Sequence, residues 1–91
     1  MTLDELRRTI DALDDDLVRL LTERAKLVVR IGELKRQSDV DVQQPDRERA
    51  VLDHVKDANP GPLSDEAMGR LFRVLIDEFT SLQRDGGRHG G

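Results

Sequence analysis

An apolar repeat over residues 3–36 limits what this chain can fold into more than any other feature of its sequence. Apolar side chains recur there at alternating steps of three and four residues, the spacing of a helix packed along a partner helix. The repeat comprises Leu3, Leu6, Ile10, Leu13, Leu17, Leu20, Leu27, Ile31 and Leu34. We therefore expect one long helix over residues 3–36, with an apolar seam along one side.

Arg24 occupies the single position of this repeat that is not apolar. Moving a charged guanidinium from water into apolar surroundings costs free energy unless an anion meets it there. That anion is either an acidic side chain, such as Asp14 or Glu23 of a second copy of the chain, or a bound ligand. The sequence leaves both possibilities open.

The predicted helix is too long for a compact chain of this size. At about 1.5 Å per residue it would be roughly 50 Å long, whereas a compact chain of 91 residues has a radius of gyration of about 12 Å. The rest of the chain can cover only part of the apolar seam. We expect a homodimer in which two long helices lie side by side.

Two shorter helices are expected after the long one. Pro45 suits the first position of a helix, and the segment Asn59-Pro60-Gly61-Pro62 ends that helix. Ser64 is expected to cap the third helix. Its predicted buried stripe is Ala67, Met68, Leu71, Phe72, Leu75, Phe79 and Leu82.

The expected fold class is all-α, with three helices, one long and two shorter, in a homodimer. Residues 1–84 are expected to form the helical domain, and residues 85–91 a flexible glycine-rich tail. Gly32 interrupts the long helix at a cost of about 1 kcal/mol relative to alanine. Either close packing against this residue or simple tolerance of it would explain its presence.

Composition restricts the partners of the chain. Its net charge is −4 and its only aromatic residues are Phe72 and Phe79, a composition that disfavours nucleic acid. It has no cysteine for a disulfide or a thiolate metal site. It also lacks an apolar run long enough to span a membrane and the layout of a signal peptide. We expect a cytoplasmic protein without a membrane or nucleic-acid partner.

A local cationic site is predicted on the long helix. Arg24 and Lys35 fall within about 20° of one direction around the helix and roughly 16 Å apart along it. Arg7 lies about 25 Å from Arg24 along the same axis, too far to share a small site with it. If two long helices cross antiparallel near their midpoints, Arg7 of one chain lies opposite about residue 32 of the other. A cationic pocket shared by two chains would follow.

Polar residues of the shorter helices would complete this pocket. Arg47 and Glu48 from the second helix and Gln83 from the third supply a guanidinium, a carboxylate and an amide. The only histidines are His54 and His89, and no cluster has metal-ligand spacing, so nucleophilic, strong-base and metal chemistry are disfavoured. Ordinary surface groups would also explain Arg7, Lys35, Arg47 and Gln83, whereas Arg24 is the hardest to explain in this way. Periodicity alone therefore leaves open a dimeric bundle that binds no ligand.

Five segments follow one another in a characteristic order along the chain. They are residues 6–14 (LRRTIDALD), 20–24 (LLTER), 31–35 (IGELK), 45–49 (PDRER), and Arg70-Leu71-Phe72 continuing to Gln83. In this order and spacing they resemble the successive motifs of the all-helical, AroQ-type chorismate mutases, over residues 3–84. The resemblance implies an intertwined dimer that converts chorismate to prephenate, a cofactor-free pericyclic rearrangement in aromatic amino-acid biosynthesis.

The resemblance also implies a role for each polar site residue. Arg24 would hold a carboxylate of the substrate, helped by Arg7 reaching in from the other protomer. Lys35 and Gln83 would donate hydrogen bonds to the ether oxygen in the transition state. The expected catalytic set is Arg24, Lys35, Glu48 and Gln83.

At the ring end of the substrate, the resemblance implies that Glu48 accepts a hydrogen bond from the ring hydroxyl and that Arg47 supports this end of the site. Two positions in the expected substrate-binding set depart from the family pattern. Gln44 stands where many members have an aspartate, so contact with the ring hydroxyl would differ. Phe79 stands where some members have a serine facing the ring carboxylate, so a side-chain hydroxyl contact is lost.

Three other functions remain open on this scaffold. Because of Gln44, two related enzymes are alternatives: a mutase acting on 4-amino-4-deoxychorismate and a lyase that removes pyruvate from isochorismate. Arg47 and Glu48 nevertheless favour chorismate mutase. The third is a non-catalytic dimerisation or regulatory module that binds an aromatic-pathway enzyme. The segment Asn59-Pro60-Gly61-Pro62 is reminiscent of mutase domains fused ahead of the first enzyme of aromatic biosynthesis. A synthase of that pathway is therefore a candidate partner.

Overall fold

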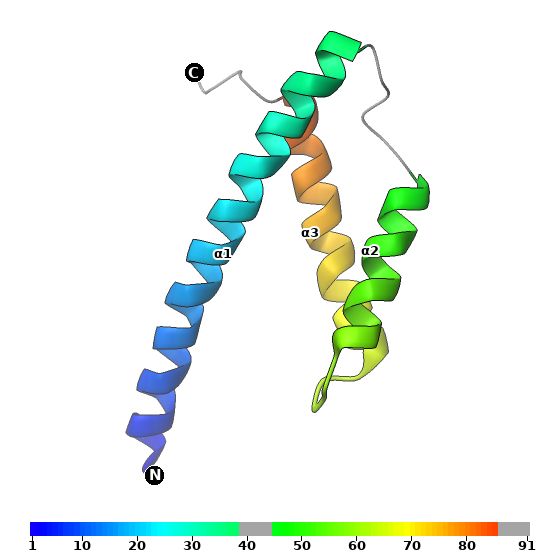
Figure 1. The fold of residues 1–91 in the computed structure, drawn as a ribbon. Helices are drawn as coiled ribbons and strands as arrows, with labels where there is room; N and C mark the ends of the chain where they lie inside the picture. Colours follow the sequence, from blue (N-terminus) through cyan, green and yellow to red (C-terminus); the bar gives the residue numbers. More distant parts are fainter. Residues whose placement is uncertain (39–44, 86–91) are drawn as a thin grey trace.

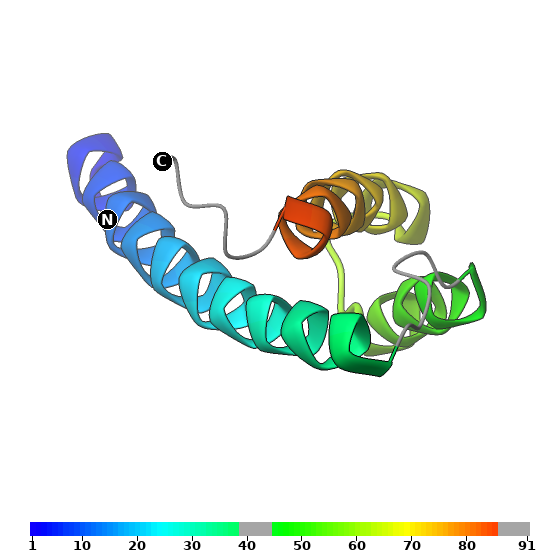
Figure 2. The same ribbon diagram turned by 90° about the horizontal axis from the view of Figure 1, so that it is seen from above.

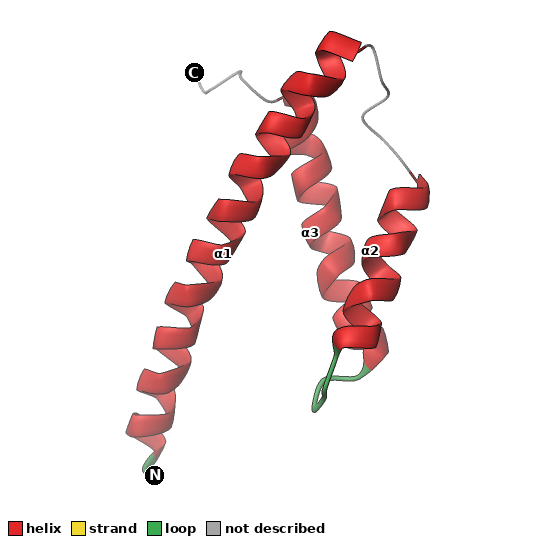
Figure 3. Ribbon diagram, in the orientation of Figure 1, coloured by secondary structure: helices red, strands yellow, loops and turns green. Residues whose placement is uncertain are grey.

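The computed structural model describes residues 1–38 and 45–85, which form three helices. The long helix α1 spans Leu3–Ser38, α2 spans Pro45–Ala58 and α3 spans Asp65–Asp85 (Figure 1). No strand occurs in the described parts of the chain, as the colouring of Figure 3 shows. The predicted all-α class, with one long and two shorter helices, is confirmed.

The start of each helix follows from local chemistry. At α1, Thr2 Oγ1 accepts a hydrogen bond from the Glu5 N–H (3.1 Å), and Glu5 Oε1 accepts one from the Thr2 N–H (3.3 Å), which forms a reciprocal capping box. Pro45 begins α2, where its missing N–H is no loss. At α3, Ser64 Oγ accepts from the Ala67 N–H at 3.0 Å. The predicted starts at Pro45 and Ser64 are confirmed.

Asn59 organises the turn between α2 and α3. Its Nδ2 donates to Leu63 O at 2.8 Å and to Asp65 Oδ1 at 2.9 Å, and its Oδ1 accepts from the Gly61 N–H at 3.1 Å. Gly61 has a φ of 74°, which residues with a Cβ rarely adopt. These contacts close a tight connection, so that α2 and α3 run antiparallel and pack side by side (Figure 1).

The chain is elongated because α1 outruns its neighbours. The helix α3 packs against both α1 and α2, but it meets only the C-terminal part of α1 (Figure 1). Figure 2, viewed from above, shows the N-terminal half of α1 extending away from the other two helices. The structure measures 54 × 31 × 14 Å with a radius of gyration of 16.1 Å, against about 12 Å for a compact chain of this length.

Little apolar surface is buried within a single chain. Ile76, at 6% exposed, is the only buried hydrophobic residue among the described ones. The members of the apolar repeat that precede Arg24 are each between 45% and 62% exposed. They are Leu3, Leu6, Ile10, Leu13, Leu17 and Leu20. Most of the long seam of α1 therefore faces solvent in the isolated chain.

The predicted buried stripe of α3 is partly wrong. Leu71 was placed on it, but its side chain is 53% exposed, whereas the unpredicted Ile76 is buried. The side of α3 that packs inward runs through Phe72, Ile76, Phe79 and Gln83. This side contains a buried glutamine, which a choice by hydrophobicity does not select. The predicted stripe was therefore centred about one residue away from the inward side, around the helix.

Two expectations fall on residues that the structure does not describe. Gln44 and residues 86–91 of the expected tail lie outside the described ranges, whereas Asp85 is the last residue of α3. Within those ranges, no helix combines the length and the apolar character needed to cross a bilayer.

Candidate active site

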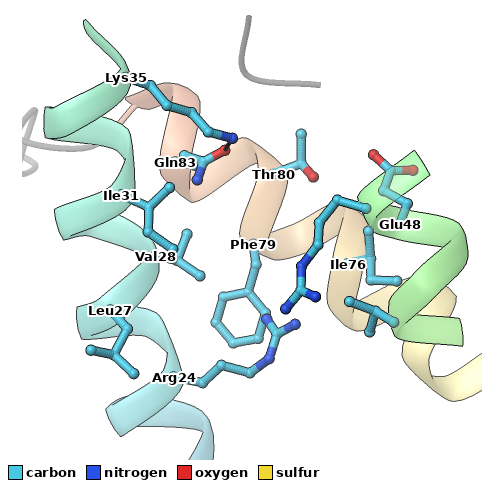
Figure 4. Close-up of a pocket in the computed structure, with 12 residues that line it drawn as sticks. Arg24, Leu27, Val28, Ile31, Lys35, Glu48, Ile76, Phe79, Thr80 and Gln83 are labelled. Atoms are coloured by element: carbon cyan, nitrogen blue, oxygen red, sulfur yellow. Dashed lines mark hydrogen bonds between the residues drawn. The ribbon is translucent and has the colours of Figure 1, made fainter. Parts of the chain in front are cut away.

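A cavity of about 350 Å³ lies between the three helices (Figure 4). Its volume is within the range of small-molecule sites, about 300 to 1,000 Å³. Six of the eight residues predicted for the site line it, namely Arg24, Lys35, Arg47, Glu48, Phe79 and Gln83. Figure 4 shows Arg24 and Lys35 projecting from the same side of α1, as the helical spacing predicted.

Arg24 lies over an aromatic ring instead of beside an acid. Its guanidinium carbon is 4.6 Å from the centroid of the Phe79 ring, which is cation–π geometry. Burial, and then the nearby charge of Arg47, lower the pKa of Arg24 from its ordinary value. Among the described residues, no carboxylate of the chain lies within ion-pair distance of Arg24. The described residues of the chain therefore supply no counter-anion to Arg24.

Lys35 and Gln83 meet at the opposite end of the cavity. Lys35 Nζ donates to Gln83 Oε1 at 3.4 Å, the dashed contact in Figure 4. Gln83 is buried, at 8% exposed, and its backbone carbonyl accepts from Arg36 Nη1 at 3.4 Å. Both contacts are long for hydrogen bonds of these types, so they are weak. An acceptor with better geometry could replace the Lys35 contact.

Gly32 explains how Gln83 comes so close to α1. A Cβ built on Gly32 would lie 2.7 Å from the Gln83 carbonyl oxygen and 3.1 Å from Gln83 Cγ. Any side chain at this position would therefore force α3 away from α1. Of the two explanations that the sequence left open, the structure supports close packing.

Glu48 joins α2 to α3 beside the cavity. Its Oε1 accepts a hydrogen bond from Arg73 Nη2 at 2.8 Å, and that bond is the main reason why the pKa of Arg73 is raised. The cavity itself is lined by three cationic side chains and one carboxylate, which leaves an excess of two positive charges. This balance suits a small dianion.

Sequence reasoning missed part of the cavity wall. Val28, Val51, Ile76 and Thr80 also line the cavity, and Arg73 contacts Glu48 from behind it. Ile76, Thr80 and Gln83 follow one another at helical spacing on α3, so they share one face of the helix. This spacing could have identified Ile76 and Thr80 as neighbours of Gln83. That signal was overlooked because the face was chosen by hydrophobicity.

The other two predicted site residues are not part of this cavity. Arg7 is exposed on the N-terminal part of α1 and does not line it, in agreement with the distance argument. Gln44 lies outside the described residues. In residues 1–38 and 45–85, no group of three or more His, Cys, Asp or Glu side chains is placed to hold a metal ion.

Comparison with known proteins identifies the family. The family model described as chorismate mutase type II matches residues 6–84. The chain belongs to the type II chorismate mutase family. A chorismate mutase from Methanocaldococcus jannaschii is 30% identical over 83 residues, which cover 90% of this chain and 84% of that protein.

Longer members of the family also match. A bifunctional chorismate mutase/prephenate dehydratase from Neisseria gonorrhoeae is 45% identical over 87 residues, which cover 91% of this chain. The chain spans only 24% of that protein's length.

A solved structure of this family has a similar fold. The form II structure of chorismate mutase from Thermus thermophilus superimposes with a TM-score of 0.87 and 32% identity. The match covers 89% of this chain and 92% of that one.

Replacing Gly32 by alanine should destabilise the chain by about 1–3 kcal/mol, because the new methyl group overlaps the Gln83 carbonyl. Gly69→Ala is the matched control, since its Cβ would meet only Lys56, with Cε at 3.0 Å, and a flexible lysine can move. That control should be neutral or stabilising by up to about 1 kcal/mol, the gain in helix propensity. Urea unfolding at one protein concentration measures both changes, and equal effects would contradict the close-packing explanation.

Proposed function

We propose that this chain catalyses the rearrangement of chorismate to prephenate. The observation that carries the proposal is the cavity, in which Arg24 lacks a carboxylate partner among the described residues. In this reaction one carbon–oxygen bond breaks while one carbon–carbon bond forms, and no proton is transferred. Catalysis then depends on holding a flexible dianion in its reactive shape and on meeting the charge that develops on the ether oxygen.

The cationic end and the donor end of the cavity have separate tasks in this proposal. Arg24, held over Phe79, binds a carboxylate of the substrate. The resulting ion pair offsets the free-energy cost of burying the guanidinium. Lys35 and Gln83 donate hydrogen bonds to the ether oxygen as its bond breaks. Their mutual contact at 3.4 Å supports this assignment, because it places the side-chain amide of Gln83 beside the ammonium of Lys35. Donors of this type contribute most when the negative charge is fully developed.

The ring end of the substrate is assigned to α2. Glu48 accepts a hydrogen bond from the ring hydroxyl, and Arg47 supports this end with its positive charge. Phe79 offers no hydroxyl to the ring carboxylate and instead supports Arg24. Gln44 is assigned to the same end from the family resemblance alone.

The exposed seam of α1 supports a homodimer in which two copies lie side by side. Apolar side chains at about half exposure along so long a helix are unfavourable in water. An intertwined arrangement would cover them and bring Arg7 of the second copy toward Arg24. The cytoplasmic location remains a prediction, and the dehydratase fusion of some relatives favours a partner from aromatic biosynthesis.

Purified chain should consume chorismate with loss of its ultraviolet absorbance, and the product should be prephenate. Release of pyruvate from isochorismate would instead identify the lyase, and turnover of only the 4-amino-4-deoxy substrate would identify the other mutase. The absence of turnover with all three substrates, even with an aromatic-pathway synthase added, would favour a non-catalytic module.

Lys35→Ala and Gln83→Ala should each lower kcat by about 10²- to 10³-fold, the effect of losing one transition-state donor. Steady-state kinetics measure the loss, and circular dichroism establishes that the helices remain. Arg84→Ala, next to Gln83 but exposed, is the control and should keep near-normal turnover. Near-normal kcat in both site variants would refute their assigned roles.

Mixing Arg7→Ala and Arg24→Ala chains tests whether the site is shared between protomers. Each variant alone should be nearly inactive. After random reassembly, each mixed dimer holds one intact site, so about a quarter of wild-type activity should return. If the mixture stays as inactive as its components, Arg7 does not act on the neighbouring protomer's site.

A further inference from the structure

The Arg73–Glu48 ion pair differs from the other ion pairs of the described residues. Its N–O distance is 2.8 Å, whereas the others lie between 3.4 and 4.0 Å. It joins two helices, whereas the others link residues three or four apart on one helix. The Glu48 side chain is 24% exposed and that of Arg73 42%, so solvent weakens this pair less than it weakens the other, more exposed pairs.

Arg73 is held firmly on α3. Its Nη2 also lies 3.4 Å from Asp77 Oδ1, one turn further along the helix. Its Nε is enclosed and has no hydrogen-bond partner among the described residues. The guanidinium is therefore positioned by its Nη2 contacts to Glu48 and Asp77.

We propose that Arg73 is a positioning residue that orients and neutralises the Glu48 carboxylate for binding of the dianionic substrate. This inference rests on the proposed function. Glu48 lines the cavity, whereas Arg73 does not, so Arg73 acts through Glu48 and not on the substrate itself. One carboxylate oxygen, Oε1, is engaged by Arg73, and Oε2 has no partner in the described part of the chain. That oxygen remains free for the ring hydroxyl.

The charge of Arg73 has a second consequence for binding. An isolated carboxylate in the cavity wall would repel a substrate that carries two negative charges. Arg73 offsets this repulsion while Glu48 keeps its ability to accept a hydrogen bond. Loss of Arg73 should therefore weaken substrate binding more than it slows the chemical step.

Four variants test this inference: Arg73→Met, Arg73→Lys, Glu48→Gln and the double variant Arg73→Met with Glu48→Gln. Arg73→Met should raise KM about tenfold and change kcat by less than about threefold. In the Glu48→Gln background the same change should alter kcat/KM by less than about twofold, because no carboxylate remains to be oriented or neutralised. Arg73→Lys, which keeps the charge, should recover most of the loss in KM.

Arg70→Met is the matched control, since Arg70 is an exposed arginine of the same helix outside the cavity. A purely structural role for Arg73 would lower kcat through a smaller active fraction, leave KM unchanged, and appear equally in both Glu48 backgrounds. Either that result, or an Arg73→Met variant that behaves like Arg70→Met, would overturn the inference. If Arg73→Met does not fold, Arg73→Lys tests the inference in its place. The inference requires that the KM of Arg73→Lys be close to that of the wild type.

Wild-type turnover of chorismate is measured first in the same experiment. If the wild type does not convert chorismate, the proposed function fails and this inference fails with it. If the wild type is active and the KM effect is absent, only the role of Arg73 is wrong.

Discussion

Arg24 is held over the ring of Phe79 with no carboxylate beside it among the described residues, and the design of the site follows from this arrangement. A guanidinium that is partly removed from water gains from an anion more than an exposed one does, because less water must be displaced and screening is weaker. The neighbouring Arg47 increases this demand for negative charge. The cavity is therefore prepared for a small anion before any ligand arrives.

Preorganisation at the other end of the cavity depends on a single close approach between helices. Gly32 lets the backbone of α3 come against α1, and this contact places Gln83 beside Lys35. Donors that are already close together reorganise less when charge develops on a reacting oxygen. The proposed reaction moves no proton, so the placement of Lys35 and Gln83 as hydrogen-bond donors contributes to catalysis directly.

The same helix that lines the cavity also carries the apolar seam on which the proposed homodimer depends. One face of the C-terminal part of α1 contributes Arg24 and Lys35 to the cavity, whereas its N-terminal half carries exposed leucines and does not pack against α2 or α3. Among the described residues of a single chain, Ile76 is the only buried hydrophobic side chain. In the proposed homodimer, covering the apolar seam and completing the cavity with Arg7 would be one event, so stability and activity would depend on the same interface.

The sequence by itself predicted the three helices and six residues that line one cavity. Pro45, Ser64 and the turn around Asn59 act through hydrogen bonds and dihedral preferences that span a few residues, so local chemistry was enough to place them. Helical spacing and family motifs likewise brought six of the eight expected residues to one cavity.

Only the tertiary structure decided which side of α3 faces inward, whether Gly32 was a contact or a tolerated residue, and that Arg73 reaches Glu48. These features depend on how far apart two helices lie and how each is rotated. Both quantities are set by side-chain packing between segments remote in sequence, and local propensity does not encode them.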